Sequence, residues 1–243
     1  MFDHVTMYVA DRDASERFFE TVLIPLGIET TYRTNAFAEW DDFSIMQVDG
    51  DSSATKRLHV GFAAPSREHV DAFWRAGIDA GFADDGSPGP RPQYVEDYYG
   101  AFLRSPDGNS IEAVHYSTVP SRTGFIDHVW IRVSDLAAAT GFYRIVADAA
   151  SLELRPASAE RTTIAGPGGA SFSLVRGEPT QHVHMAFPGD NAAVDRFHAS
   201  LTSAGFRDNG EPRERPQYHP GYYAAYVLDP DGNNIEVVNH NRR

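Results

Sequence analysis

The sequence lacks cysteine, contains a single lysine and has no long uninterrupted apolar run. The absence of cysteine excludes disulfides, thiolate metal ligands and cysteine nucleophiles, so a transition-metal site needs nitrogen and oxygen donors. The only lysine, Lys56, excludes a conventional P-loop and argues against Schiff-base chemistry. No run approaches the roughly 18 apolar residues of a membrane-spanning helix. What remains is a chain of 243 residues, 42% hydrophobic, which is long enough for two ordinary domains with buried cores.

Basic charge is also scarce. The formal net charge is -13, and the arginines are dispersed along the chain. Such a surface repels phosphate backbones and anionic membranes, so we expect neither nucleic acid nor a membrane as a partner. The N-terminus enters a strand-like segment without a basic and apolar leader, which favours a cytoplasmic location.

The second half of the sequence repeats the first. Matching residues lie 124 positions apart along almost the whole chain: His4 with His128, Arg91 with Arg215, Pro106 with Pro230, and Glu112 with Glu236. The register slips once, where His59 matches His184 at a separation of 125. This period is too long for a solenoid repeat. We therefore predict two homologous domains, residues 1–117 and 125–243, joined by a Ser/Thr/Pro/Gly-rich linker at residues 118–124.

Each predicted domain contains the same order of elements twice. Residues 4–9 alternate apolar and polar side chains, which predicts a strand with one face on a core. Residues 13–26 have the apolar spacing of an amphipathic helix, with Asp13 and Glu16 as its capping box. Three more strand-like pieces follow before the pattern restarts. The sequence therefore predicts an α+β fold of four βαβββ units, in which helices cover one sheet face and the other is left for a ligand.

Two glutamates, Glu112 and Glu236, lie inside otherwise apolar strand-like runs. A buried carboxylate is costly unless a cation or hydrogen-bond donors compensate for its lost hydration. Strand alternation places each glutamate, with two histidines from other strands, on the face opposite the core. These sets are His4, His59 and Glu112 in the first domain, and His128, His184 and Glu236 in the second. Two imidazoles and one carboxylate are the donors of a facial metal triad. The alternatives are hydrogen-bonded structural histidines and a glutamate paired with an arginine.

These residues, the PDGN-x-IE ending of each domain and the order of elements resemble the vicinal oxygen chelate superfamily. That superfamily includes glyoxalase I, fosfomycin-resistance proteins, bleomycin-binding proteins and type I extradiol ring-cleavage dioxygenases. The resemblance covers nearly the whole chain and implies two glyoxalase-like domains, each a cupped mixed sheet around a divalent metal. We expect Fe2+ or Mn2+, and Zn2+, Ni2+ or Co2+ would also suit the donors. In such enzymes the metal chelates two adjacent oxygens of a small substrate and stabilises the oxyanion that develops.

One feature that separates the reactions of this superfamily is a second carboxylate. Glyoxalase-like enzymes carry it on the last strand of the first unit, where it transfers a proton. The corresponding strands here offer Gln47 in the first domain and Arg176 in the second, so the expected carboxylate is missing.

A second feature lies near the end of the chain. Extradiol dioxygenases end in a histidine, a tyrosine and the ligand glutamate, and His219, Tyr226 and Glu236 follow in that order. By this likeness His219 is an acid–base group and Tyr226 hydrogen-bonds a substrate oxygen. Otherwise His219 is a loop histidine and Tyr226 a packed hairpin aromatic. Val95 and Phe102 replace the pair in the first domain, so we expect the second domain to be the principal site.

Extradiol-type dioxygenation by the second-domain triad is the leading hypothesis. A glyoxalase-like lyase or isomerase is the enzymatic alternative, and a non-catalytic protein that binds a small molecule such as an antibiotic is the other. Alternation also places Tyr8, Trp130 and Arg132 on the cup faces. There they line the substrate pocket, with Arg132 attracting an anionic group, or lie at its rim. The chain is either a monomer with an internal pseudo-dimer or a homodimer.

Overall fold

The computed structural model describes residues 1–49, 53–117, 124–166 and 168–241. Apart from Gly124, the predicted linker at 118–124 lies outside these residues. Within the described part of the chain there are sixteen strands, four α-helices and one 3-10 helix. The strands are β1 (His4–Val9), β2 (Tyr32–Arg33), β3 (Phe37–Trp40), β4 (Phe43–Gln47), β5 (His59–Ala63), β6 (Ala83–Pro90), β7 (Tyr99–Arg104), β8 (Ser110–His115), β9 (Ile126–Val133), β10 (Glu153–Ser158), β11 (Arg161–Ala165), β12 (Ser171–Arg176), β13 (Val183–Pro188), β14 (Asp208–Glu214), β15 (Tyr223–Leu228) and β16 (Asn234–Asn239). The helices are α1 (Arg12–Leu23), η1 (Ile24–Leu26), α2 (Arg67–Asp79), α3 (Leu136–Ala149) and α4 (Asn191–Ser203).

The order βαβββ occurs four times, which confirms the predicted α+β fold of four units. The strands form two mixed sheets of eight strands each. Sheet 1 has the order β14-β15-β16-β13-β1-β4-β3-β2, and sheet 2 has the order β10-β11-β12-β9-β5-β8-β7-β6. Each sheet therefore combines one unit from each half of the sequence.

This pairing of units corrects the expectation that each half of the sequence forms its own cup. Sheet 1 joins the first and fourth units through the antiparallel pair β1 and β13. Sheet 2 joins the second and third units through the antiparallel pair β5 and β9. The four first strands have the same alternating pattern, and nothing within a unit indicates which of the other three it joins.

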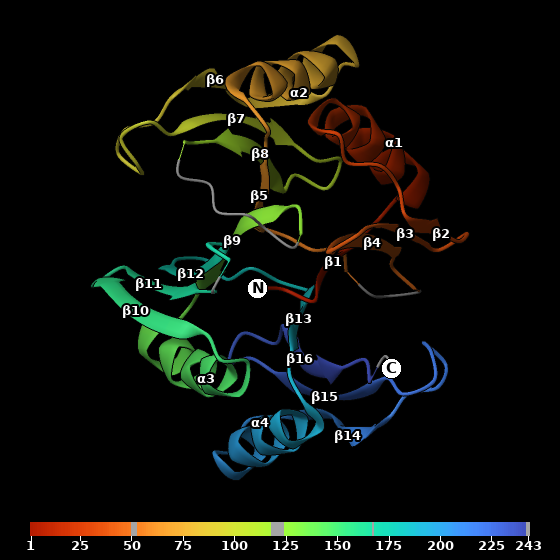
Figure 1. The fold of residues 1–243 in the computed structure, drawn as a ribbon, viewed down its shortest axis with the longest axis vertical. Helices are drawn as coiled ribbons and strands as arrows, with labels where there is room; N and C mark the ends of the chain where they lie inside the picture. The colour runs from red at the N-terminus through yellow and green to blue at the C-terminus, as the bar shows by residue number, and fades with distance from the viewer. Residues whose placement is uncertain (50–52, 118–123, 167, 242–243) are drawn as a thin grey trace.

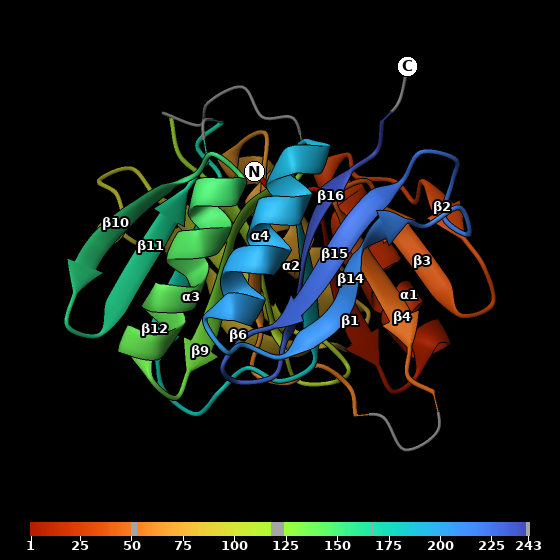
Figure 2. The same cartoon turned by 90° about the horizontal axis from the view of Figure 1, so that it is seen from below.

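The helices pack in two pairs at opposite ends of the molecule. Helices α1 and α2 lie against each other, as do α3 and α4, and the two sheets lie between the pairs (Figures 1 and 2). Each sheet is covered by one helix from each pair, because α1 and α4 contact sheet 1 while α2 and α3 contact sheet 2. No helix in the described ranges is long and apolar enough to cross a membrane.

One continuous core joins the two sheets. Val5, Met7 and Val9 of β1 are buried as predicted, while His4 stays partly exposed on the opposite face. Across the core, Phe43 of sheet 1 meets Phe62 of sheet 2 edge-on, with ring centroids 5.2 Å apart. The apolar side chains of each strand thus pack in the core, and the histidines and glutamates lie on the opposite face of the sheet.

The start of α1 differs from the predicted capping box. The N-cap is Asp11, whose carboxylate accepts a hydrogen bond from the Ala14 backbone N–H at 2.9 Å. Asp13 lies in the first turn, and Glu16 forms an ion pair with Arg12 at 2.9 Å. Both Asp11 and Asp13 are residues that favour the N-cap position, and the sequence alone does not distinguish them, because the cap is defined by its backbone geometry.

Candidate metal centres

The six predicted ligands gather into two clusters. Cluster 1 contains His4, His184 and Glu236, and cluster 2 contains His59, Glu112 and His128. Every residue lies on the strand face predicted for it, but the predicted grouping by sequence half is wrong. His4 and His128 have exchanged partners because β1 joins β13 and β9 joins β5.

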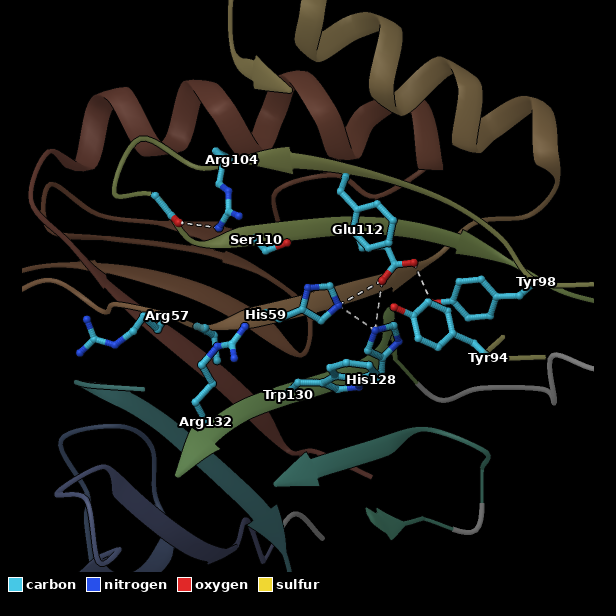
Figure 3. A pocket seen from close by; sticks show the side chains of 13 residues that line it. Arg57, His59, Tyr94, Tyr98, Arg104, Ser110, Glu112, His128, Trp130 and Arg132 are labelled. Carbon is cyan, nitrogen blue, oxygen red and sulfur yellow. Dashed lines mark hydrogen bonds and ion pairs between the residues drawn. The ribbon is translucent and has the colours of Figure 1, made fainter. Parts of the chain in front are cut away.

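Cluster 2 is compact (Figure 3). The Nε2 atoms of His59 and His128 are 2.9 Å apart, and Oε2 of Glu112 is 3.1 Å and 3.2 Å from them. Adjacent donors around a six-coordinate ion with bonds of ~2.1 Å are separated by ~3.0 Å, because that edge is the bond length times the square root of two. The three donor atoms therefore fit one face of a divalent transition-metal ion.

Cluster 1 has the same plan with one longer edge. Nε2 of His184 lies 3.0 Å from Nε2 of His4 and 3.0 Å from Oε2 of Glu236. The separation between His4 and Glu236 is 3.7 Å. The donor set also suits a divalent ion, which would have to draw His4 and Glu236 closer together.

A tyrosine hydrogen-bonds the glutamate of each cluster. The Tyr98 hydroxyl donates to Oε1 of Glu112 at 2.7 Å, and the Tyr222 hydroxyl donates to Oε1 of Glu236 at the same distance. Only Oε2 of each carboxylate then faces the histidines. Sequence reasoning missed these residues, although a Tyr-Tyr pair stands at the same place in both repeats, fourteen positions before each glutamate.

An aspartate orients one histidine in each cluster. Nδ1 of His4 and Nδ1 of His128 each lie 2.8 Å from the carboxylate of the preceding residue, Asp3 or Asp127. A hydrogen bond from Nδ1–H fixes the tautomer that leaves Nε2 free to bind a metal, and it raises the basicity of the ring. The Asp-His dipeptide recurs in both repeats and was a signal that could have found both aspartates.

A glycine makes room for His128. Gly61 lies opposite His128 in the pair of β5 with β9, and a Cβ on Gly61 would lie 2.3 Å from Cε1 of the imidazole. The ring of His128 therefore occupies the space above the strand that a side chain would fill. In sheet 1 the corresponding position holds Ala186, opposite His4.

Neighbouring charges compensate for the burial of the glutamates. Burial opposes ionisation of Glu112, but hydrogen bonds from His128 and His59 outweigh it and lower its pKa to about 2. Burial also opposes protonation of His128, but hydrogen bonds to Asp127 and Glu112 raise its pKa to about 9. Without metal, the His128 cation therefore offsets the charge of the buried Glu112 carboxylate. A divalent ion would take over this role if His128 bound it as a neutral ligand. No arginine pairs with either ligand glutamate among the described residues.

A cavity of about 330 Å³ opens beside cluster 2. It is lined by Arg57, Leu58, His59, Tyr94, Tyr98, Phe102, Arg104, Gly108, Ser110, Glu112, His128, Trp130 and Arg132. Three arginines lie on one side of the cluster, and Tyr94 and Tyr98 lie on the other (Figure 3). The triad is thus reached from a pocket with a cationic end and an aromatic end.

Comparison with known proteins places this geometry in a family. The model for the Glyoxalase/Bleomycin resistance protein/Dioxygenase superfamily matches residues 1–113 and 125–237. The chain belongs to this superfamily. Among solved structures it is similar to glyoxalase I from Zea mays, with a TM-score of 0.70, 15% identity, and coverage of 98% of this chain and 92% of that one. It is also similar to a putative dioxygenase from Bacillus subtilis subsp. subtilis str. 168, with a TM-score of 0.66 and 12% identity. That match covers 99% of this chain and 85% of the other. No curated protein matches. Because both sequences are no more than 15% identical to this one, these two likenesses concern the fold alone.

The second carboxylate expected from the resemblance to glyoxalase-like enzymes has serines at the corresponding strand positions. On the last strand of the second and fourth units, Glu112 and Glu236 each pair with the residue two positions after a cluster histidine of the first strand. On the last strand of the first and third units, the residues in the equivalent pairing are Ser44 and Ser173, and both are buried. Neither residue weighed from the sequence replaces the missing carboxylate. Gln47 bonds to the start of α1, and Arg176 forms an ion pair with Glu160.

The histidine and tyrosine expected to be catalytic both lie near cluster 1. Tyr226 lies directly across from Glu236 on β15, and its ring centroid is 6.1 Å from that of His184. The Nε2 atom of His219 lies 2.8 Å from Nδ1 of His240, whose Nε2 lies 2.8 Å from Asp3. Tyr226 is thus next to the cluster, whereas His219 ends a chain of hydrogen bonds that reaches His4 through its aspartate.

Proposed function

We propose that the chain is a divalent-metal-dependent enzyme that acts on a small molecule with two adjacent oxygens, and that cluster 2 is its principal site. The observation that carries this proposal is a set of three donor atoms, from three strands, within 3.2 Å of one another beside a cavity of about 330 Å³. Small-molecule sites are concave, with a few polar groups converging on one point. This choice replaces the second-domain site expected from the sequence.

Extradiol-type dioxygenation is the reaction that the donor set supports best. Two histidines and one carboxylate on one face of an ion are the ligands of non-haem Fe(II) oxygenases, which keep the remaining positions for substrate and oxygen. When bound, Fe2+ or Mn2+ would supply Lewis acidity toward two neighbouring substrate oxygens. The alternative, a glyoxalase-like lyase or isomerase, needs a proton-transferring base, and Ser44 and Ser173 do not supply one.

The surrounding residues hold the site for such a substrate. Tyr98 holds the carboxylate of Glu112, and Asp127 holds the ring of His128, so the donor atoms are preorganised. Trp130 lies within 6 Å of both cluster 2 imidazoles, ring centroid to centroid, and offers a flat wall. At cluster 1 we assign Tyr226 to hydrogen bonding with a bound substrate. His219 is a positioning residue that acts through His240 and Asp3.

Metal analysis of anaerobically purified protein tests the proposal. Wild type should hold two ions per chain, Glu112→Gln and Glu236→Gln should each hold one, and the double variant none. Glu160→Gln is the matched control, because it makes the same change at an exposed residue outside both clusters. Equal metal content in all variants would remove the metal-dependent enzyme and leave a small-molecule binding protein.

Oxygen consumption tests the reaction. Iron-loaded wild type should consume oxygen with members of a catechol panel, Glu112→Gln should lose this activity, and Glu236→Gln should retain most of it. Absence of uptake by iron-loaded wild type with every catechol sinks the dioxygenase and favours the glyoxalase-like alternative, while the metal result stands separately.

A further inference from the structure

The cavity beside cluster 2 is cationic at one end, and one of its three arginines has no ion-pair or hydrogen-bond partner among the described residues. Arg57 pairs with Glu178 at 3.1 Å, and Arg104 pairs with Asp85 at 2.6 Å. Arg132 lines the same cavity, and within the described residues its guanidinium forms neither an ion pair nor a hydrogen bond. In a chain with a net charge of -13, this leaves one uncompensated positive charge facing the pocket.

The backbone holds Arg132 beside Arg57. The Thr180 hydroxyl donates to the Arg57 carbonyl at 2.7 Å and accepts a hydrogen bond from the Arg132 N–H at 2.9 Å. Thr180 is fully buried. The two arginines therefore start from neighbouring, fixed points on the same side of the triad (Figure 3).

The internal repeat supplies a comparison for these arginines. The positions equivalent to Arg57, Arg104 and Arg132 at cluster 1 hold His182, Leu228 and Tyr8. The shared fold and the shared ligand set therefore do not require arginine at any of them. A fourth arginine is common to both repeats, since Arg91 stands over Phe102 and Arg215 over Tyr226, so it does not distinguish the cups.

Flat aromatic surfaces complete the cavity. Trp130 meets Tyr94 edge-on at 5.9 Å and lies 5.5 Å from the ring of His59, centroid to centroid. Phe102 lies 6.0 Å from the same imidazole. A volume of about 330 Å³ is near the lower end of the range for small-molecule pockets, roughly 300–1,000 Å³, so one ring with a short substituent fills it.

We propose that this cavity takes a planar substrate that bears a carboxylate, with the carboxylate on Arg132 and two adjacent oxygens directed at His59, Glu112 and His128. The proposal rests on the proposed function for the direction of the adjacent oxygens. A guanidinium presents paired N–H donors that match a carboxylate, and a charge-assisted bond of this kind discriminates strongly against a neutral analogue.

Paired probes test the proposal on protein loaded with Mn2+ without oxygen. 3,4-Dihydroxybenzoate carries the carboxylate, and 4-methylcatechol carries a methyl group in its place. By calorimetry, Arg132→Gln should weaken binding of 3,4-dihydroxybenzoate roughly ten- to a hundredfold and change that of 4-methylcatechol less than about threefold. The two probes differ in how strongly they chelate the metal, so the affinity of each probe is compared between wild type and Arg132→Gln. Arg155→Gln, which removes an exposed cation outside the cavity, should change neither affinity.

Two further measurements complete the test. Arg132→Lys keeps the charge and should recover part of the lost affinity, and the preference for the carboxylate should persist in metal-free protein. Metal content is measured in the same samples. Failure of wild type to bind 3,4-dihydroxybenzoate, or an equal effect of Arg132→Gln on both probes, overturns the inference while cluster 2 still holds metal. Loss of metal from wild-type cluster 2 would instead overturn the proposed function.

Discussion

The Nε2 atoms of His59 and His128 lie 2.9 Å apart, although the two residues belong to different halves of the sequence. The antiparallel pair of β5 with β9 brings them together, as β1 with β13 does for His4 and His184. Both clusters therefore depend on the packing of one half against the other. A change that loosens these strand pairs should affect metal binding before it affects the separate units.

Gly61→Ala should empty cluster 2 selectively. The new methyl group would lie 2.3 Å from the His128 ring, which must move away from the other two donors. Measured in the Glu236→Gln background, where only cluster 2 remains, metal content should fall well below one ion per chain. Gly141→Ala is the matched control, because a Cβ there meets no atom within 4 Å. Full metal content in Gly61→Ala would contradict the geometry assigned to His128.

His240→Ala should weaken metal binding at cluster 1. His240 bonds to Asp3, which bonds to His4, and loss of such an outer partner typically lowers metal affinity about ten- to a hundredfold. Competition with a chelator, in the Glu112→Gln background, measures this affinity. His69→Ala, at an exposed histidine, should leave it unchanged. An unchanged affinity in His240→Ala would show that the chain of hydrogen bonds does not position His4.

Asn109→Ala should destabilise the fold that carries cluster 2. Asn109 is fully buried; its side chain accepts from the Leu58 N–H at 3.0 Å and donates to the Thr55 carbonyl at 2.8 Å. These bonds tie the turn before β8 to the segment before β5. Leaving both backbone groups unsatisfied should lower the free energy of unfolding by about 2–4 kcal/mol, measured by denaturant unfolding. Asn35→Ala, at an exposed loop residue, should change it by less than about 0.5 kcal/mol.

Asp42 should make stability fall as pH rises. Burial raises the pKa of Asp42 from 3.8 to about 6, and the nearby charge of Asp41 adds to this rise. Hydrogen bonds from the Phe125 and Ile126 N–H groups lower the pKa but do not outweigh the burial. The folded state therefore binds the proton more tightly than the unfolded state, and the stabilisation present below about pH 4 is lost as pH rises through about 6. Relative to Asp42→Asn, wild type should lose up to about 3 kcal/mol between pH 4 and 7 in denaturant unfolding. A constant difference between the two proteins across this range would refute the shift.

The sequence was sufficient to predict the four units and the strand faces of the clustered histidines and glutamates, but not how the units pair. Period-2 alternation in each strand correctly separated His4 from Val5 and Met7, because one face must pack on the core. The partner of β1 could not be found in this way, since β5, β9 and β13 have the same pattern. Tyr98 and Asp127 recur at equivalent positions of the repeat, but their hydrogen bonds to Glu112 and His128 are side-chain contacts that sequence spacing does not reveal.

Each cup is built from both halves of one chain, as it would be from two identical subunits. In a pair of identical subunits the two cups would be copies, and every substitution would alter both. In the fused chain a substitution reaches one cup alone, as Arg132 at one centre and Tyr8 at the other demonstrate. The duplication thus provides a single protein with two clusters whose surroundings can change independently of each other.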